Sequence, residues 1–225
     1  MSSAGGDVSR ETSHPLPQWA SAAQSGLEAY ASLLATVGVE RGLIGPREVP
    51  RIWDRHILNC LVVADPELGL VPTASRVADV GSGAGLPGLV WALARPDIEM
   101  ILVEPLLRRS TFLQEATAAL GVASRVQVDR TRAEDARRND SWQPVDIVTA
   151  RAVAPLERLL GWTLPLLRPG GRLVALKGSS ALDEITAAAQ VTTAMGLHDV
   201  RVVTCGEAVV DPATSVVVGE WGTAQ

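Results

Sequence analysis

Cysteine and histidine are scarce in this chain, and their scarcity excludes several kinds of site. The 225 residues include two cysteines and three histidines. Cys60 and Cys205 lie far apart in the sequence, which gives neither a disulfide framework nor the paired spacing of a zinc site. We therefore expect no metal, and we expect the protein to work in the reducing environment of the cytoplasm.

The sequence also lacks long apolar runs and a secretory leader. Its apolar runs are short or interrupted by charged residues, glycine and proline, so none is long enough to span a bilayer. The N-terminus does not show the basic and then apolar order of a signal peptide. We predict a soluble protein with no membrane partner.

Positive charge is in deficit, with 20 Lys and Arg residues against 25 Asp and Glu residues and a net charge of −5. This balance argues mildly against a nucleic-acid partner, because contacts with phosphate depend on Lys and Arg. Net charge is an average, however, and a local basic patch is compatible with it.

Hydrophobic residues make up 47% of the chain, which is enough for one well-buried core. The length fits one α/β domain with a small appendage. Residues 1–16 are rich in serine, glycine and charge, and we predict that they are disordered. We predict a helical cap over 17–71 and a Rossmann-like domain over 72–225.

The cap is predicted from helical spacing alone. Apolar residues recur every three or four positions between Trp19 and Val37, which indicates a first helix with one buried face. A second helix is predicted over Arg51–Ala64, ended by Asp65 and Pro66.

After Pro72, short apolar strands alternate with helices, as in a parallel sheet built from βα units. Strands are predicted at Arg76–Val80, Met100–Glu104, Val126–Val128, Asp146–Ala150, Arg172–Lys177, Arg201–Thr204 and Ser215–Val218. Helices are predicted at Pro87–Ala94, Leu106–Leu120, Leu156–Leu166 and Ala181–Met195. The segment 206–214 is too short for a helical crossover, so the last two strands should form a hairpin at one edge. This seven-stranded, mostly parallel sheet is typical of the methyltransferase variant of the doubly wound fold.

A glycine-rich turn follows the first predicted strand and is the most informative segment. Gly81, Gly83, Gly85 and Gly88 keep side chains away from the backbone N–H groups at the start of the next helix, and Pro87 suits its first position. The turn predicts a bound ligand. Three of the glycines also satisfy the dinucleotide pattern G-x-G-x-x-G, and an acid, Glu104, follows where that pattern places its ribose-binding residue. Glu104 suits S-adenosylmethionine and NAD equally, so an NAD(P)-binding oxidoreductase stays open at this point.

Six segments in order carry a resemblance to one family. They are Trp53–Asn59, Asp79–Gly88, Arg108–Leu113, Ala133–Glu134, Ala150–Ala152 and Leu176–Gly178. With them the chain resembles the RsmG (GidB) family of 16S ribosomal RNA guanine-N7 methyltransferases over about Arg51 to Ile185. It departs from the family pattern in carrying Glu104 where Asp is commoner, Arg108 where Lys is commoner and Ala150 in place of Ser.

The resemblance implies a Rossmann-like class I methyltransferase with S-adenosylmethionine as cofactor, acting as a monomer on 16S ribosomal RNA or the small ribosomal subunit. It implies an acid, Asp79, facing the methionine portion of the cofactor, and places Arg151 beside the reaction centre. Lys177 ends an apolar strand and is followed by Gly178, so we expect it to emerge over the site, and we predict catalytic roles for Arg151 and Lys177. The full set of expected cofactor-binding residues is Asp79, Gly81, Gly83, Gly85, Leu86, Glu104, Ala133, Glu134 and Arg151.

A basic rim at the carboxyl ends of the strands would reconcile RNA binding with the negative net charge. Its expected members are Arg51, Arg55, His56, Arg108, Arg109 and Lys177. Plainer interpretations stay open: Arg151 paired with Glu157 at the surface, His56 as a core or capping residue, and the other cations as solvated charge.

The N7 atom of guanine has a free lone pair, so its methylation needs no general base, and none is evident in the sequence. Catalysis would then rest on alignment of the reactants and exclusion of water. We expect the basic residues to hold phosphates and leave N7 free. A small-molecule methyltransferase and a non-catalytic RNA-binding module are the other open alternatives.

Overall fold

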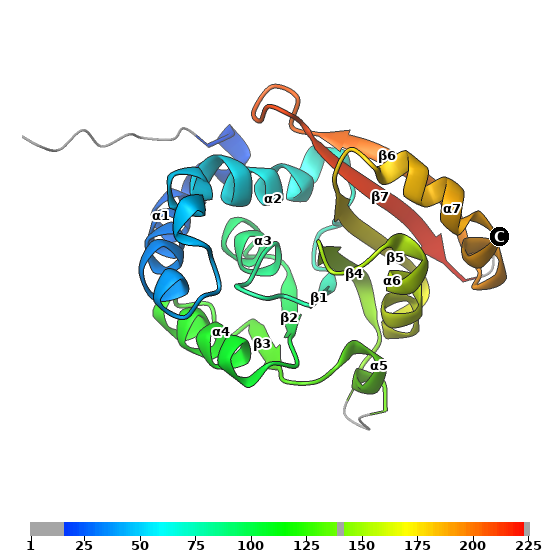
Figure 1. Ribbon diagram of the computed structural model, residues 1–225, viewed down its shortest axis with the longest axis horizontal. Coiled ribbons are helices and arrows are strands. Elements are labelled where there is room, and N and C mark those ends of the chain that lie inside the picture. Colours follow the sequence, from blue (N-terminus) through cyan, green and yellow to red (C-terminus); the bar gives the residue numbers. More distant parts are fainter. Residues whose placement is uncertain (1–15, 139–141, 223–225) are drawn as a thin grey trace, which may run out of the picture.

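Five apolar segments form a parallel sheet, because the connections between them are helical crossovers that return the chain in the same direction. These strands are β1 (Arg76–Val80), β2 (Glu99–Val103), β3 (Val126–Asp129), β4 (Val145–Arg151) and β5 (Leu167–Lys177). Two more strands, β6 (Leu197–Cys205) and β7 (Thr214–Trp221), pair antiparallel with each other. The strand order is β3-β2-β1-β4-β5-β7-β6 (Figure 1). The predicted seven-stranded, mostly parallel sheet and its terminal hairpin are confirmed.

The computed structural model describes residues 16–138 and 142–222. The predicted disorder of residues 1–16 therefore lies outside the described residues, except for Leu16. In the described part, no helix is long and apolar enough to cross a membrane.

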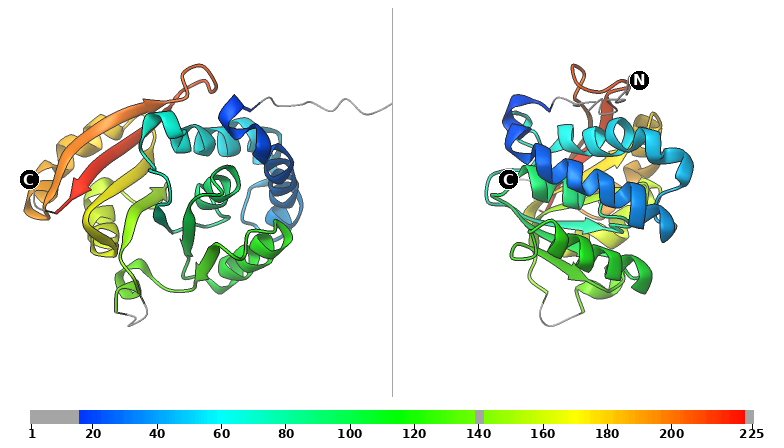
Figure 2. Two further views of the ribbon diagram at one scale, coloured as in Figure 1. Left: turned by 180° about the vertical axis from the view of Figure 1, so that it is seen from behind. Right: turned by 90° about the vertical axis from the view of Figure 1, so that its left-hand side faces the viewer.

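Alternating side chains along the strands separate two hydrophobic clusters, one on each face of the sheet. Val77 and Leu102 belong to the first cluster, which α3 (Gly88–Ala94) and α4 (Leu107–Ala119) cover together with the N-terminal helices. Ala78 and Val80 belong to the second, which α5 (Ala133–Ala136), α6 (Leu156–Thr163) and α7 (Ala181–Ala194) cover. The sheet is thus a middle layer between two helical layers (Figure 2).

The N-terminal region consists of helical segments that share the first hydrophobic cluster with the sheet. Trp91 of α3 donates its indole N–H to the carbonyl of Cys60 at 2.8 Å, which fastens this region to the sheet layer. The cap thus has no separate core, and the predicted division at residue 71 stays a prediction. Its segments are η1 (Gln18–Ala23), α1 (Gln24–Leu33), η2 (Leu34–Gly38), η3 (Pro46–Arg51), η4 (Ile52–Leu58), α2 (Asn59–Leu61), η5 (Val62–Ala64) and η6 (Pro66–Leu68).

The structure departs from the sequence expectation mainly at element ends. The strand β5 begins at Leu167 instead of Arg172, and β6 begins at Leu197 instead of Arg201. Each extension begins at a buried leucine, Leu167 or Leu197, and continues through residues that show no alternating apolar pattern. The strand β2 ends at Val103, one residue before Glu104, and the short helix α5 was not predicted.

Candidate functional site

The glycines of the turn after β1 divide into two structural roles. Gly81 and Gly83 have φ values of 70° and 59° and line a cavity at the carboxyl end of the sheet. Gly85 and Gly88 instead allow close packing, since an added Cβ would lie 2.5 Å from Leu89 Cδ1 at Gly85 and 2.4 Å from Leu102 Cδ2 at Gly88. Only the first pair therefore presents its backbone to a ligand.

Two acids stand at the ends of β1 and β2. Asp79 is fully buried, and its Oδ2 accepts the backbone N–H of Gly88 at 3.0 Å, at the start of α3. Burial raises the pKa of Asp79 to about 7. Glu104 is 1% exposed, and its two carboxylate oxygens accept the backbone N–H groups of Gly83 and Leu106, each at 3.0 Å.

The cavity beside these residues, which we call the glycine-turn cavity, has a volume of about 780 Å³. Leu43 and Ile44 of the cap lie on one side of it, and Arg158 and Trp162 of α6 lie on another, with the guanidinium carbon of Arg158 4.9 Å from the Trp162 ring centroid. The residues predicted from the sequence that line it are Gly81, Gly83, Leu86, Glu104, Ala133, Glu134, Arg151, His56 and Arg109. Two predicted cofactor residues, Asp79 and Gly85, lie behind this lining.

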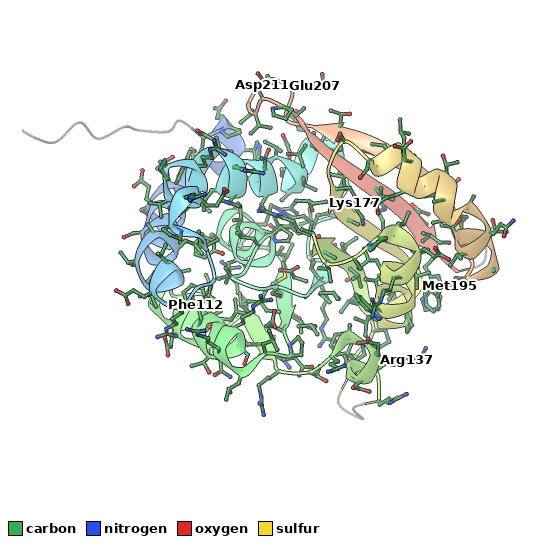
Figure 3. All side chains as sticks on the ribbon, viewed as in Figure 1. Phe112, Arg137, Lys177, Met195, Glu207 and Asp211 are labelled. Carbon is green, nitrogen blue, oxygen red and sulfur yellow. The ribbon has the colours of Figure 1, made fainter. Side chains whose placement is uncertain are left out.

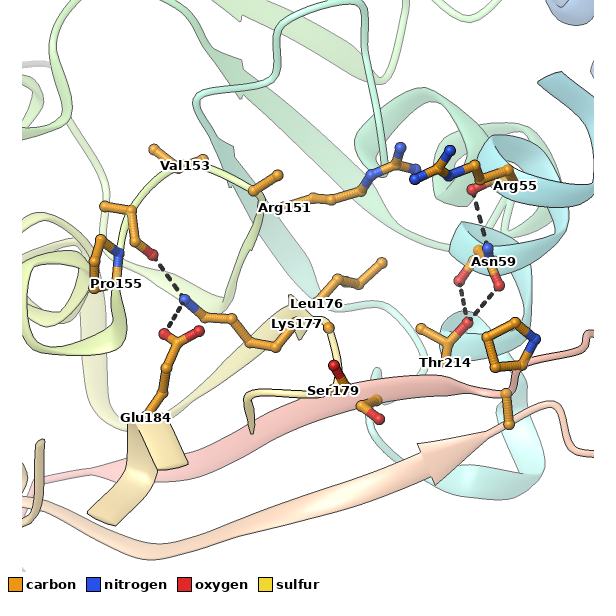
Figure 4. Close-up of a pocket in the computed structure, with 16 residues that line it drawn as sticks. Arg55, Asn59, Arg151, Val153, Pro155, Leu176, Lys177, Ser179, Glu184 and Thr214 are labelled. Atoms are coloured by element: carbon orange, nitrogen blue, oxygen red, sulfur yellow. Dashed lines mark hydrogen bonds and ion pairs between the residues drawn. The ribbon is translucent and has the colours of Figure 1, made fainter. Parts of the chain in front are cut away.

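A second cavity of about 650 Å³, which we call the Lys177 cavity, lies next to the first (Figure 4). Arg55 and Asn59 of the cap, Lys177 of β5 and Thr214 of β7 contribute to its lining. Thr214 donates its hydroxyl to Asn59 Oδ1 at 2.9 Å, which fastens the edge hairpin to the cap. Residues 151–153 line both cavities and form the wall that the two share.

Lys177 holds this wall in place instead of projecting into solvent. Its side chain is 8% exposed, and its Nζ donates to the Ala154 carbonyl and to Glu184 Oε2, each at 2.7 Å. Glu184 Oε2 also accepts the backbone N–H of Leu156 at 2.8 Å, the first residue of α6. One ion pair thus joins β5, α6, α7 and the segment after Arg151. Figure 3 shows Lys177 toward the middle of the molecule and Arg137 at its periphery.

Arg151 is held by the cap. Its Nη1 donates to Cys60 Sγ at 3.1 Å and to the His56 carbonyl at 3.4 Å, and its Nη2 donates to His56 Nδ1. The Nε2 of His56 lies 3.0 Å from Glu48 Oε2. Arg151 therefore pairs with residues of the cap, and none of its hydrogen-bond partners is Glu157.

The remaining predicted cations are dispersed. Arg55 lines the Lys177 cavity, and Arg109 lines the glycine-turn cavity with its Nη1 3.8 Å from Glu104 Oε2. Arg51 and Arg108 are exposed and line neither cavity. The structure thus brings part of the predicted rim together at the cavities and leaves these two on the surface.

Several residues of the site escape sequence reasoning. Glu48 contacts His56, and Glu184 contacts Lys177, but no local pattern in the sequence distinguishes either acid from a surface acid. Tyr30 donates its hydroxyl to the Ala84 carbonyl at 2.8 Å beneath the turn, although its spacing predicted only a buried helix position. Trp162 lies in a predicted helix, but no pattern in the sequence indicates that it lines the cavity.

One group in the described part of the chain has the composition of a cation site. Ligand atoms of His198, Asp199 and Glu220 lie within 4.8 Å of one another. Glu220 already accepts a hydrogen bond from Arg172 at 3.0 Å, and Asp199 is exposed. We assign no ion to this group, and the absence of a metal stays a prediction.

Comparison with known proteins identifies close relatives. A family model described as rRNA small subunit methyltransferase G matches residues 23–212. The protein named ribosomal RNA small subunit methyltransferase G from Mycolicibacterium gilvum is 53% identical over 195 residues, which cover 87% of this chain and 83% of that protein. The protein of the same name from Salinispora tropica is 57% identical over 192 residues, which cover 84% of this chain and 78% of that protein.

Solved structures share the fold at low sequence identity. The O-methyltransferase TomG from Streptomyces achromogenes, in complex with SAM, has a TM-score of 0.59 and 16% identity over 86% of this chain and 90% of that chain. A putative O-methyltransferase from Klebsiella pneumoniae has a TM-score of 0.58 and 15% identity over 92% and 98%. The predicted Rossmann-like methyltransferase fold is thereby confirmed.

Proposed function

This chain belongs to the GidB family of rRNA small subunit methyltransferase G, and from that premise we propose that it methylates a guanine of 16S ribosomal RNA at N7, with S-adenosylmethionine as methyl donor. The observation that carries the proposal is the pair of adjoining cavities that share the wall 151–153. One cavity suits the donor and the other suits the acceptor nucleoside. The oxidoreductase alternative is not retained, because the relatives are methyltransferases.

The glycine-turn cavity fits S-adenosylmethionine. Its volume of about 780 Å³ lies within the range of about 300–1,000 Å³ that is usual for ligand sites. Each carboxylate oxygen of Glu104 accepts one backbone N–H group and keeps a lone pair for a ribose hydroxyl. Leu86 and Ala133 add apolar surface for the adenine ring. When bound, the donor supplies a sulfonium-activated methyl group.

The Lys177 cavity suits a flipped-out guanosine, because it opens beside the shared wall and is lined by both polar and apolar side chains. The Lys177–Glu184 ion pair orders the wall, and Arg151 lies between the two cavities. N7 needs no deprotonation, so the residues of the site have to align donor and acceptor and exclude water. Arg55 lines this cavity with a side chain that is 59% exposed, so it can meet phosphate.

The test is a mass map of 16S ribosomal RNA from a strain that lacks the gene, complemented with wild-type or variant protein. A Gly81→Asp variant should fail to restore one N7-methylguanine, since its Cβ would lie 2.9 Å from Val153 Cγ2 and its side chain would enter the cavity. Gly121→Asp is the matched control, because Gly121 has a similar φ of 69° and an added Cβ meets nothing within 4 Å. An unchanged map in the deletion strain would refute the ribosomal assignment.

A small-molecule acceptor would show itself in the same experiment as cofactor binding without any change in the RNA map. The cytoplasmic location and the monomeric state expected from the sequence stay predictions.

A further inference from the structure

Arg151 occupies a position that two ligands would share. It lines the glycine-turn cavity and the Lys177 cavity, and it is the last residue of β4. Among the described residues, the hydrogen on Nε and one hydrogen on Nη2 of Arg151 have no hydrogen-bond acceptor. Two donors therefore remain for a ligand, provided that the guanidinium plane is held at a fixed angle.

The contacts with His56 fix the proton on its ring. A guanidinium group can only donate, so His56 Nδ1 must accept and must carry no proton. The ring proton then lies on Nε2, which donates to Glu48 Oε2 at 3.0 Å. The hydrogen bonds from Arg151 to His56 and from His56 to Glu48 are therefore donated in one direction, and this arrangement requires a neutral imidazole.

Charge and burial favour that neutral form. The side chain of His56 is 11% exposed, and that of Glu48 is 30% exposed. Burial lowers the pKa of His56, and the positive charges of Arg151 and Arg55 lower it further, while the hydrogen bond and charge of Glu48 oppose them.

The guanidinium of Arg151 is also faced by Cys60 and Tyr30 of the cap and by Asp79 of β1. Cys60, Tyr30 and Asp79 all favour the charged form of Arg151. The Cys60 thiol has its pKa raised by burial, as does the Tyr30 hydroxyl, so both are neutral near pH 7.

We propose that Glu48 and His56 are positioning residues for methyl transfer, which hold the Arg151 guanidinium at the wall between donor and acceptor cavities through a neutral imidazole. This inference rests on the proposed function for its kinetic test. It assigns the histidine of the cap an internal role in place of RNA contact, and it adds Glu48, which lies outside every segment that carries the family resemblance.

The direct test is ¹⁵N NMR of the histidine side chains in the protein without ligands. The chain has three histidines, so a His56→Gln variant identifies the signal of interest. At pH 7.5 we expect a neutral ring with the proton on Nε2. A proton on Nδ1, or a charged ring at that pH, would overturn the proposal whether or not the protein methylates RNA.

The kinetic test compares pH profiles of single-turnover methylation of small ribosomal subunits. Activity should fall with decreasing pH as His56 gains a proton and repels Arg151. In Glu48→Gln the carboxylate that raises the pKa of His56 is gone, so this acid limb should move to lower pH. Glu40→Gln is the matched control, because Glu40 is an exposed acid of the same cap, and its limb should match that of the wild type. An unmoved limb in Glu48→Gln would refute the proposal, since a limb due to Asp79 would not respond to Glu48.

Substitution of His56 separates positioning from RNA contact. His56→Leu should lower kcat by about tenfold or more, because misplacement of a group by about 1 Å can cost about a hundredfold, with a smaller change in KM for the subunit. His56→Gln should recover part of the loss, since an amide can accept from Arg151 and donate to Glu48. A raised KM with unchanged kcat in His56→Leu would show RNA contact and contradict the proposal. If the wild-type protein does not methylate the subunits at all, the proposed function is overturned and the NMR result still stands.

Discussion

Lys177 Nζ and Glu184 Oε2 lie 2.7 Å apart, and this ion pair fastens the end of β5 to α7 beside the wall that both cavities share. The pair is largely shielded, with side-chain exposures of 8% and 23%. Both partners have further bonds, to the Ala154 carbonyl and the Leu156 N–H group, so loss of either side chain affects the segment 152–156. Lys177 therefore holds the shared wall in place in addition to contributing a positive charge to the site.

Replacement of one partner should therefore destabilise the fold. We expect Glu184→Ala to lower the free energy of unfolding by about 1–3 kcal/mol, because it leaves a poorly solvated ammonium group with one acceptor. Urea denaturation measures the change. Arg138→Ala is a matched control at an exposed pair, with side-chain exposures of 80% and 49%, and should change the unfolding free energy by less than about 1 kcal/mol. Equal losses in the two variants would contradict this role of the pair.

Glu104→Gln should weaken binding of S-adenosylmethionine by about tenfold or more. The substitution keeps the size of the side chain, but it removes the charge that strengthens the proposed bonds to the ribose hydroxyls. Isothermal titration calorimetry gives the dissociation constant. Glu99→Gln, at the exposed start of β2, should bind the cofactor as the wild type does. An unchanged constant in Glu104→Gln would remove Glu104 from the cofactor site.

Asp79→Asn should change how stability depends on pH. Burial raises the pKa of Asp79 from 3.8 to about 7, so the folded state holds a proton that the unfolded chain releases at lower pH. The wild type should lose stability relative to the variant as pH rises from about 4 to about 7, by at most on the order of 4 kcal/mol. Urea denaturation at pH 4, 5.5 and 7.5 measures the difference between the two proteins. A difference that is constant across this range would show that Asp79 has an ordinary pKa.

The fold could be predicted from the sequence because its determinants are local. Each inner strand is an apolar run, and the turn after Val80 has positive φ at Gly81, Gly83 and Gly85, a conformation that glycine adopts without steric cost. The prediction shortened the edge strand β6 because only its two end residues are buried and its pairing with β7 includes an irregularity between His198 and Arg201. Backbone pairing at such an edge does not require alternating apolar residues, so the sequence carries no pattern from which these strand ends could be predicted.

The site was predictable only in its parts that lie on the turn and the strand ends. Gly81 and Glu104 follow from their positions after β1 and β2, since carboxyl ends of parallel strands meet at one edge. Folding of the cap brings Glu48 to His56, and packing of α7 brings Glu184 to Lys177. Sequence spacing carries no information about such contacts, so the prediction that Lys177 emerges over the site gave no sign of its ion pair with Glu184.

Arg51 and Arg108, the two arginines of the predicted rim that line neither cavity, give the sharpest test of the predicted RNA contacts. If both contact phosphate, the double variant Arg51→Ala, Arg108→Ala should reduce the magnitude of the negative slope of log K against log salt concentration for subunit binding by about 1.4 to 1.8. The cofactor affinity should not change, because neither residue lines a cavity. Filter binding between 50 and 300 mM salt, as a rough working range, measures the slope. The matched control is the exposed pair Arg137 and Arg138 near α5, whose replacement removes the same charge. Equal slopes for the two double variants would mean that the arginines act only through net charge, and RNA binding would then depend on Arg55 and Arg109 beside the cavities.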